Sequence, residues 1–103
     1  MDIELLHDYC ISKPNVTEGF PFGEDTLVFK VRGRIFALAN LDSEPSVNLK
    51  CNPALAIELR EKYDSVSPGY HMNKKHWNTV LLDGSIPDAE LFTWIDHSYD
   101  LVK

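Results

Sequence analysis

The chain has 103 residues, 44% hydrophobic and 25% charged, a composition that predicts one globular domain with its own hydrophobic core. An intrinsically disordered chain would be far more polar, so that class is excluded. The formal net charge of −6 disfavours non-specific nucleic-acid binding by the surface as a whole.

The first predicted element is a helix over residues 2–12. Its apolar residues recur on one face at i, i+3 and i+7: Ile3, Leu6 and Cys10. Asp2 complements the positive N-terminus of the helix dipole. Lys13-Pro14 should end the helix, because the residue before a proline avoids the α region. Residues 18–23 (Glu-Gly-Phe-Pro-Phe-Gly) then form a turn-rich connector with two aromatic side chains.

A β-hairpin is predicted next. Strands at Thr26–Val31 and Arg34–Leu41 flank Arg32-Gly33, which suits a tight two-residue turn. The expected cross-strand neighbours on the apolar face are Phe29 with Phe36 and Leu27 with Leu38. The other face carries Val28, Lys30, Ile35 and Ala37. This second face is less polar than a water-exposed face should be, so we expect another segment to cover part of it.

The second half of the chain alternates strands and helices. A third strand is predicted at Ser46–Cys51, where apolar and polar residues alternate. Asn52-Pro53 should begin a helix that runs to about Tyr63, with an N-cap residue followed by proline at the first helical position. Ser67-Pro68-Gly69 is predicted as a turn, and Trp77–Leu82 as a fourth strand. Pro87 and Asp88 open a last helix with an apolar stripe at Leu91, Ile95, Tyr99 and Val102.

The resulting order, α-β-β-β-α-β-α, predicts an α+β fold. We expect a mainly antiparallel sheet with helices packed on one face, in a single domain over residues 1–103. No internal repeat or linker divides the chain.

The sequence also predicts the cellular location of the protein. No stretch approaches the roughly eighteen consecutive apolar residues of a membrane span. The N-terminal residues MDIELLHDYC carry acids where a secretory signal has a basic region. We therefore expect a cytoplasmic monomer with no membrane partner. Cys10 and Cys51 are expected to be reduced and buried, as small apolar side chains of the core.

No catalytic or cofactor-binding constellation stands out. A nucleophilic Ser or Cys needs a base beside it, and the sequence has no Gly-x-Ser-x-Gly element. No glycine-rich turn precedes a helix in the form that cradles phosphate. The four histidines (His7, His71, His76 and His97) lack the close spacing typical of zinc ligands. We expect no metal, no cofactor and no enzymatic activity.

Two internal segments carry basic residues and no acid. Residues 69–78 (Gly-Tyr-His-Met-Asn-Lys-Lys-His-Trp-Asn) combine aromatic, cationic and amide groups, which can bind phosphates and stack bases. A structural interpretation remains open, in which Trp77 is a mostly buried strand residue and Lys74-Lys75 keep a loop soluble. The second segment, residues 30–34, is the predicted hairpin tip, where positive charge also guards a sheet edge against pairing.

The chain resembles the MmcQ/YjbR family of bacterial proteins over essentially its whole length. The matching stretches are Phe20–Asp25 leading into Leu27–Val31, Ser46–Cys51, Gly69–Val80 and Asp83–Asp88. The most specific of them is the element His-x-Asn-Lys-x-His-Trp at residues 71–77. The resemblance implies a CyaY-like fold, with helices on one face of an antiparallel sheet. It also implies a predicted DNA-binding role with a "double wing" motif, and members often continue beyond the last helix, where this sequence stops at Lys103.

Three functional hypotheses follow. The first is a DNA-binding or regulatory module with weak, salt-dependent affinity. Its candidate residues are Lys30, Arg32, Arg34, Tyr70, His71, Asn73, Lys74, Lys75 and His76. The second is a protein- or small-ligand-binding domain with a groove lined by the segment Tyr70–Trp77. The third is a metal site on the acids of the first helix, by analogy with frataxin-like folds. Arginine and lysine side chains that share one surface would favour the first hypothesis, and pairing with acidic helices would favour the second.

Overall fold

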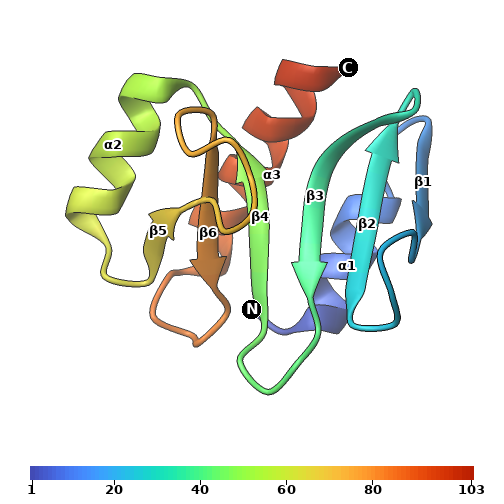
Figure 1. Cartoon of the computed structure of the whole chain (residues 1–103), viewed down its shortest axis with the longest axis horizontal. Helices are drawn as coiled ribbons and strands as arrows, with labels where there is room; N and C mark the ends of the chain where they lie inside the picture. The colour runs from blue at the N-terminus through green and yellow to red at the C-terminus, as the bar shows by residue number, and fades with distance from the viewer.

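The computed structural model describes all of residues 1–103 and contains three helices and six strands. In chain order the elements are α1 (Ile3–Ile11), β1 (Val16–Gly19), β2 (Thr26–Val31), β3 (Arg34–Asn40), β4 (Ser46–Lys50), α2 (Pro53–Lys62), β5 (Val66–Pro68), β6 (Trp77–Leu81) and α3 (Asp88–Val102). The strands form one sheet in the order β1-β2-β3-β4-β6-β5, with antiparallel pairing throughout. Figure 1 shows this sheet from the side away from α1 and α3.

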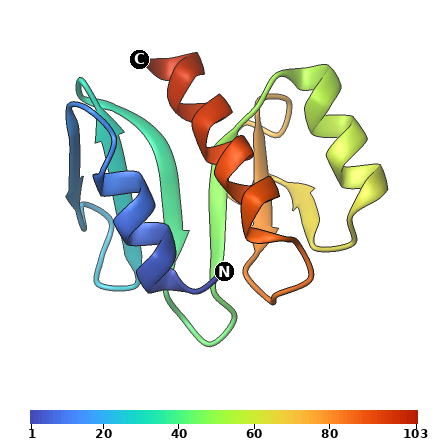
Figure 2. The same cartoon turned by 180° about the vertical axis from the view of Figure 1, so that it is seen from behind.

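All three helices pack on one face of the sheet, as predicted. Seen from behind, α3 crosses the middle strands, α1 lies over the β1–β2 side and α2 packs at the β5–β6 edge (Figure 2). The predicted α+β class and one-sided helical layer are confirmed. We call the face that carries the helices the covered face and the opposite one the open face. No helix is long and apolar enough to cross a membrane.

The predicted element order omitted two strands. β1 and β5 lie at the two edges of the sheet, where each has one neighbour. Both are very short and lack the apolar alternation that marks a strand in the sequence. β5 includes Pro68, predicted as part of a turn, which is tolerated because an edge strand leaves one row of N–H groups unpaired. Tertiary pairing, rather than local sequence, creates these two elements.

The helix starts follow the predicted capping pattern. The Asp2 carboxylate accepts a hydrogen bond from the Leu5 N–H at 2.8 Å, and Asn52 Oδ1 accepts one from the Ala54 N–H at 3.0 Å. α3 begins directly after Pro87 and has no side-chain cap. Its predicted stripe of Leu91, Ile95, Tyr99 and Val102 is buried.

The predicted hairpin is present, but its register is wrong by one residue over most of its length. Arg32 and Gly33 both have positive φ, 52° and 80°, as a tight turn between twisted strands requires. A β-bulge between Phe29 and Lys30 then shifts the pairing, so that Phe29 faces Ala37 rather than Phe36. Leu27 likewise faces Ala39 rather than Leu38. The two phenylalanine rings still pack diagonally, with 6.4 Å between their centroids, because a bulge displaces the strand without turning Phe36 out of the core.

The hydrophobic core lies between the covered face and the helices. It includes Phe29, Phe36 and Val47 from the strands and Leu6 from α1, each with no exposed surface. Ser98 of α3 is the main polar group inside it. Its hydroxyl donates to the Phe36 carbonyl at 2.6 Å and accepts from the Lys50 N–H at 2.9 Å. The side chain therefore pins α3 to β3 and β4 together.

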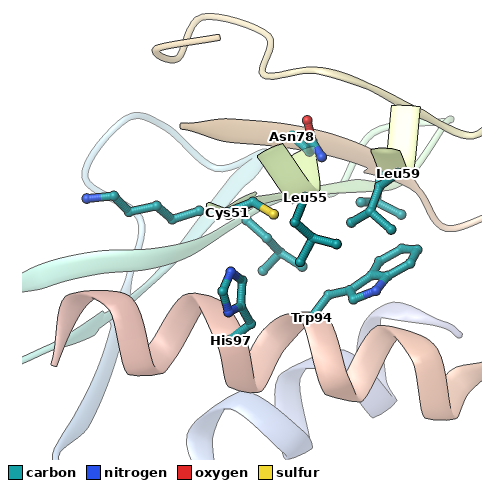
Figure 3. A pocket seen from close by; sticks show the side chains of 9 residues that line it. Cys51, Leu55, Leu59, Asn78, Trp94 and His97 are labelled. Carbon is teal, nitrogen blue, oxygen red and sulfur yellow. The ribbon is translucent and has the colours of Figure 1, made fainter. Parts of the chain in front are cut away.

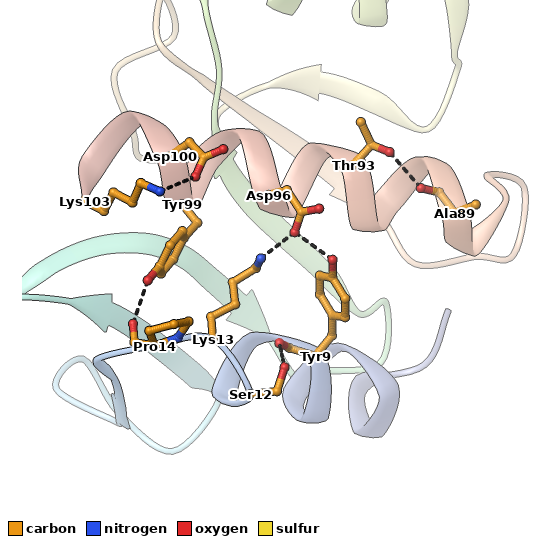
Figure 4. A network of polar contacts seen from close by, with 10 residues as sticks. All are labelled: Tyr9, Ser12, Lys13, Pro14, Ala89, Thr93, Asp96, Tyr99, Asp100 and Lys103. Carbon is orange, nitrogen blue, oxygen red and sulfur yellow. Dashed lines mark hydrogen bonds and ion pairs between the residues drawn. The ribbon is translucent and has the colours of Figure 1, made fainter.

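A second polar contact joins α3 to α1 and the segment after it, at the rim of the core. Asp96 of α3 accepts hydrogen bonds from the Tyr9 hydroxyl at 2.7 Å and from Lys13 Nζ at 2.5 Å (Figure 4). Partial burial alone would raise the pKa of Asp96, but these two donors hold it below its usual value. The same bond raises the pKa of Tyr9 to about 12. Lys13 is thereby neutralised by a carboxylate of the helical layer.

Two expectations about side chains concern burial. Cys10 and Cys51 are free and buried, as expected, and burial raises the pKa of both thiols, that of Cys10 to about 12. Trp77 is partly covered, neither fully buried nor exposed, which agrees with the expectation of a mostly buried residue. It lies outside the main core, however. Asn78 and Val80 point to the covered face, and Trp77 therefore stands on the open face.

Candidate functional site

Basic and acidic residues gather at opposite ends of the sheet. The chain reverses direction at every connection, so successive connections alternate between the two ends. Connections 12–15, 32–33, 51–52 and 69–76 consequently lie at one end of the sheet, shown uppermost in Figure 1. These connections carry Lys13, Arg32, Lys74 and Lys75 and no Asp or Glu. Arg34, the first residue of β3, and Lys50, the last residue of β4, lie at the same end. We call this the basic end. Connections 20–25, 41–45, 63–65 and 82–87 lie at the other, acidic end. They carry Glu24, Asp25, Asp42, Glu44, Asp64 and Asp83 and no Lys or Arg.

The ion pairs leave most bases of the basic end free. Side-chain amines pair with carboxylates in two places, Lys13 with Asp96 and Lys103 with Asp100. Both carboxylates belong to α3. Arg32, Arg34 and Lys75 are exposed and form no ion pair. Lys30, on the neighbouring strand β2, is half-buried and also unpaired.

The connection between β5 and β6, the 69–76 loop, folds over the open face and is strongly bonded within itself. Asn73 Oδ1 accepts from the Lys75 N–H at 2.9 Å, and Lys74 Nζ donates to the Gly69 carbonyl at 3.1 Å. From the covered face, Arg60 of α2 donates to the Lys74 carbonyl and, through Nε, to Asn78 Oδ1 at 2.7 Å. Hydrogen bonds to itself and to α2 therefore hold the loop in place, although it has no regular secondary structure.

Glycine at position 69 allows this loop to approach the sheet. A Cβ atom at Gly69 would lie 2.8 Å from the Trp77 Cβ, closer than Cβ atoms approach one another, and 3.1 Å from the Met72 Cβ, a tight contact. At the loop tip, His71 takes the left-handed conformation, with φ of 59°. A non-glycine residue with positive φ is uncommon, and here it directs the chain back toward the sheet.

The predicted site residues fall into two groups. Arg32, Arg34, Lys74 and Lys75 all lie at the basic end, with Lys30 on the adjoining strand and Asn73 inside the loop. Tyr70 and His71 instead lie over the open face, with 4.0 Å between their ring centroids. His76 is half-buried, and its carbonyl accepts from the Cys51 N–H at 2.7 Å, so its backbone has a structural role.

Tyr70, His71 and Met72, in the segment to which the second hypothesis assigned a groove, form one wall of such a groove. The groove has a volume of about 340 Å³. Its other lining residues are Phe22, Thr26, Leu38, Asn40 and Asn48, contributed by the 20–25 connection and by three strands. No Asp, Glu, Lys or Arg lines it. The predicted second face of the hairpin (Val28, Lys30, Ile35 and Ala37) contributes nothing to the lining, and Ala37 belongs to the core. Leu38, predicted on the apolar face with Leu27, lines the groove instead, because the bulge shifts the register of the hairpin by one residue.

A chain of hydrogen bonds ties the loop to the groove floor. The Tyr70 N–H donates to Thr79 Oγ1 at 2.9 Å, and the Thr79 hydroxyl donates to Asn48 Oδ1 at 2.5 Å. Asn48 is 5% exposed, and its side-chain NH₂ group makes no hydrogen bond inside the protein. This NH₂ group still reaches solvent, since no fully buried side-chain polar atom lacks a partner. The floor of the groove thus presents an uncommitted donor.

The other notable cluster, on the covered face, does not form a reactive site. Cys51, Leu55, Leu59, Trp94 and His97 surround a cavity of about 10 Å³, too small for any ligand beyond a single water (Figure 3). Burial raises the pKa of the Cys51 thiol, which opposes nucleophilic activation. His97 Nε2 accepts from the Asn52 N–H at 3.2 Å, so its lone pair is already used. No three His, Cys, Asp or Glu side chains converge anywhere to hold a metal ion.

Comparison with known proteins identifies the family. A model of the YjbR family matches residues 11–101. Protein YjbR of Escherichia coli K12 is 38% identical over 100 residues, which make up 96% of this chain and 85% of that protein. The chain belongs to the YjbR family. The resemblance inferred from the sequence is confirmed.

Solved structures show that this fold is shared within the YjbR family. The crystal structure of Deinococcus radiodurans protein DR2400, with its domain DUF419, has a TM-score of 0.92 at 40% identity. The aligned part covers 97% of this chain and 77% of that one. A crystal structure from Pseudomonas syringae has a TM-score of 0.88 at 30% identity over all of both chains. The names of these bacterial proteins state no ligand and no activity, so function has to be argued from the site.

Proposed function

We propose that this protein is a nucleic-acid-binding module, not an enzyme, and that it contacts phosphates with the side chains of the basic end. The observation that supports the proposal is the segregation of charge between the two ends of the sheet. A net charge of −6 would oppose approach of a polyanion if it were spread evenly. Because the connections at the basic end carry four bases and no acid, a phosphate that approaches this end meets cationic side chains.

The state of the individual cations also supports binding of phosphates. Arg32, Arg34 and Lys75 are exposed and unpaired, so binding a phosphate breaks no existing ion pair. Lys74 is partly committed to the Gly69 carbonyl, and we expect it to contribute less. Pairing with the acidic helices, which would have favoured a different function, is confined to Lys13 and Lys103.

The number of available cations sets the expected affinity. Neutralising three to five phosphates gives a slope of log affinity against log salt of about −3 to −5 on duplex DNA. The long axis of the molecule, 32 Å, corresponds to roughly nine base pairs at ~3.4 Å each. Binding without sequence recognition should be weak, around 10⁻⁴ M at physiological salt.

The experiment is a titration of a labelled twelve-base-pair duplex between 20 and 200 mM salt, read by fluorescence anisotropy. Replacing both Arg34 and Lys75 by glutamine should flatten the salt slope by about two and leave the fold intact. Lys62→Gln is the matched control, since Lys62 is an exposed base near the acidic end and its loss alters net charge equally to that of Lys75. No binding at 20 mM salt, or an equal effect of Lys62→Gln and Lys75→Gln, would overturn the proposal.

A second candidate function is supported by the groove itself. A hollow of about 340 Å³ flanked by aromatic rings has the size and lining of a small-ligand site. In that case the groove would bind its ligand with no contribution from the basic end. Small-ligand binding that is lost when Tyr70 is replaced, and whose affinity does not depend on salt concentration, would favour this candidate.

A further inference from the structure

Two exposed aromatic side chains line the groove on the open face, and no Asp, Glu, Lys or Arg does. Phe22 has 66% of its surface exposed and Tyr70 has 68%. Exposed apolar side chains that line one hollow are typical of a binding site. Flat rings in the lining suit a flat partner that can stack against them.

The floor of the groove selects for hydrogen-bond acceptors. Asn48 Oδ1 already accepts from the Thr79 hydroxyl, whereas its NH₂ group makes no hydrogen bond inside the protein and is free to donate to a ligand. Asn40 Oδ1 similarly accepts from the Asp42 N–H at 3.3 Å, and its NH₂ group is free to donate. Two amide donors without a partner in the protein therefore line the hollow, and each amide oxygen already accepts one hydrogen bond.

We infer that this groove is a binding site for one unpaired nucleobase, supplied by a single-stranded segment whose phosphates lie toward the basic end. The inference rests on the proposed nucleic-acid function and specifies how it would work. A flat heterocycle would stack on Phe22 and Tyr70 while its ring acceptors receive the amide hydrogens of Asn40 and Asn48. A base within a duplex cannot reach a hollow in a sheet, so the base has to be unpaired.

The donor pattern also predicts which base is preferred. Asparagine recognises adenine by accepting from N6 and donating to N7. Each amide oxygen of the groove already accepts one hydrogen bond, so adenine N6 would have to share it with a donor of the protein. Guanine presents two adjacent acceptors, O6 and N7, and matches two donors. We therefore expect guanine to bind more tightly than adenine.

The test uses otherwise abasic DNA octamers that carry one guanine, one adenine or no base at the fourth position. All three have the same phosphates, so any difference in affinity comes from the base. The guanine octamer should bind roughly tenfold more tightly than the fully abasic one, with adenine in between. In a ¹H–¹⁵N spectrum, the guanine octamer should shift the side-chain NH₂ signals of Asn40 and Asn48, and the abasic octamer should not.

Two variants connect this effect to the groove. Tyr70→Ala and Phe22→Ala should each reduce the guanine octamer's advantage to less than threefold while leaving the salt slope unchanged. Phe20→Ala is the matched control, because Phe20 is an exposed aromatic of the same connection that does not line the groove. An equal effect of Phe20→Ala would overturn the assignment.

The outcomes separate this inference from the function on which it rests. If all three octamers bind equally, with a slope that depends on Arg34 and Lys75, phosphate binding holds and the base site is wrong. If none binds at 20 mM salt, the base site is wrong, and the duplex titration decides the proposed function separately. If the base effect appears without any dependence on Arg34 and Lys75, the groove is the site and the basic end is not.

Discussion

The two faces of the sheet come from the same strands but are built in different ways. On the covered face, Phe29, Phe36 and Val47 are fully buried against helices. On the open face of the neighbouring strands, Asn48 and Thr79 form a hydrogen-bonded floor that a loop covers only in part. The covered face is therefore specified by apolar volume, and the open face by the direction of a few polar groups. We expect substitutions on the first to change stability and substitutions on the second to change binding.

Deleting an aromatic ring should give the largest difference between the faces. Phe36→Ala removes a side chain with no exposed surface and should cost about 3–5 kcal/mol of unfolding free energy. Phe22→Ala removes the same ring from an exposed position and should change stability by less than ~0.5 kcal/mol. Urea denaturation of both variants measures this. A loss above ~2 kcal/mol for Phe22→Ala would mean that the open face is part of the core.

A smaller loss should follow from crowding the loop against the open face. Gly69→Ala places a methyl group 2.8 Å from the Trp77 Cβ, and overpacking of this kind costs about 1–3 kcal/mol. The strain should also displace the 69–76 loop and weaken the binding of any ligand in the groove. Gly19→Ala is the control, because nothing lies within 4 Å of a Cβ there. Equal stability of the two variants by thermal unfolding would show that the loop is not held against the sheet.

Removing the Ser98 hydroxyl tests how much this buried polar group of the covered face contributes to stability. Ser98→Ala leaves the Lys50 N–H and the Phe36 carbonyl without their shared partner, at a cost of about 1–3 kcal/mol. Thr93 on the same helix is the matched control. Its hydroxyl donates to the Ala89 carbonyl at 3.0 Å on the exposed surface (Figure 4), so Thr93→Ala should change stability by less than ~0.5 kcal/mol. A Ser98→Ala protein as stable as Thr93→Ala would exclude a pinning role.

The covered face was also the more predictable one. Apolar spacing in residues 2–12 and 88–102, together with Asn52-Pro53, located the helices, because burial and capping leave local patterns. The bulge at Phe29–Lys30 and the edge strands β1 and β5 left no such pattern, since tertiary pairing decides them. The basic segments were visible as residues 30–34 and 69–78. That both segments lie at the same end of the sheet could be inferred only by knowing that each connection reverses the direction of the chain.

The groove was predictable only from one side. Its lining comes from five separate segments, and Phe22 or Asn48 alone carries no signal of a site. That Asn48 Oδ1 accepts a hydrogen bond depends on a contact between β4 and β6, and no spacing in the sequence encodes it. Tyr70 and His71 were identified as candidates because aromatic, cationic and amide groups gather in residues 69–78. Their position over the open face separates them from the lysines of that segment.

The smallest expected effect concerns pH, at the rim of the covered face. His7 of α1 contacts Asp8 at 3.1 Å and Glu18 at 2.6 Å, and its ring lies 5.9 Å from that of Phe29. The hydrogen bond to Asp8, opposed by partial burial and assisted by Glu18, raises the pKa of His7 above 6.5. A raised folded-state pKa means that the stabilisation is complete below the unfolded value and is lost as pH rises through the folded one. The His7 side chain is 35% exposed, so the contribution should stay below ~0.5 kcal/mol. Comparing His7→Gln with the parent protein by urea unfolding at pH 5.5 and pH 8 isolates it, because other titrating groups are common to both. The stability lost on substitution should be greater at pH 5.5, and a greater loss at pH 8 would contradict the role assigned to the protonated imidazole.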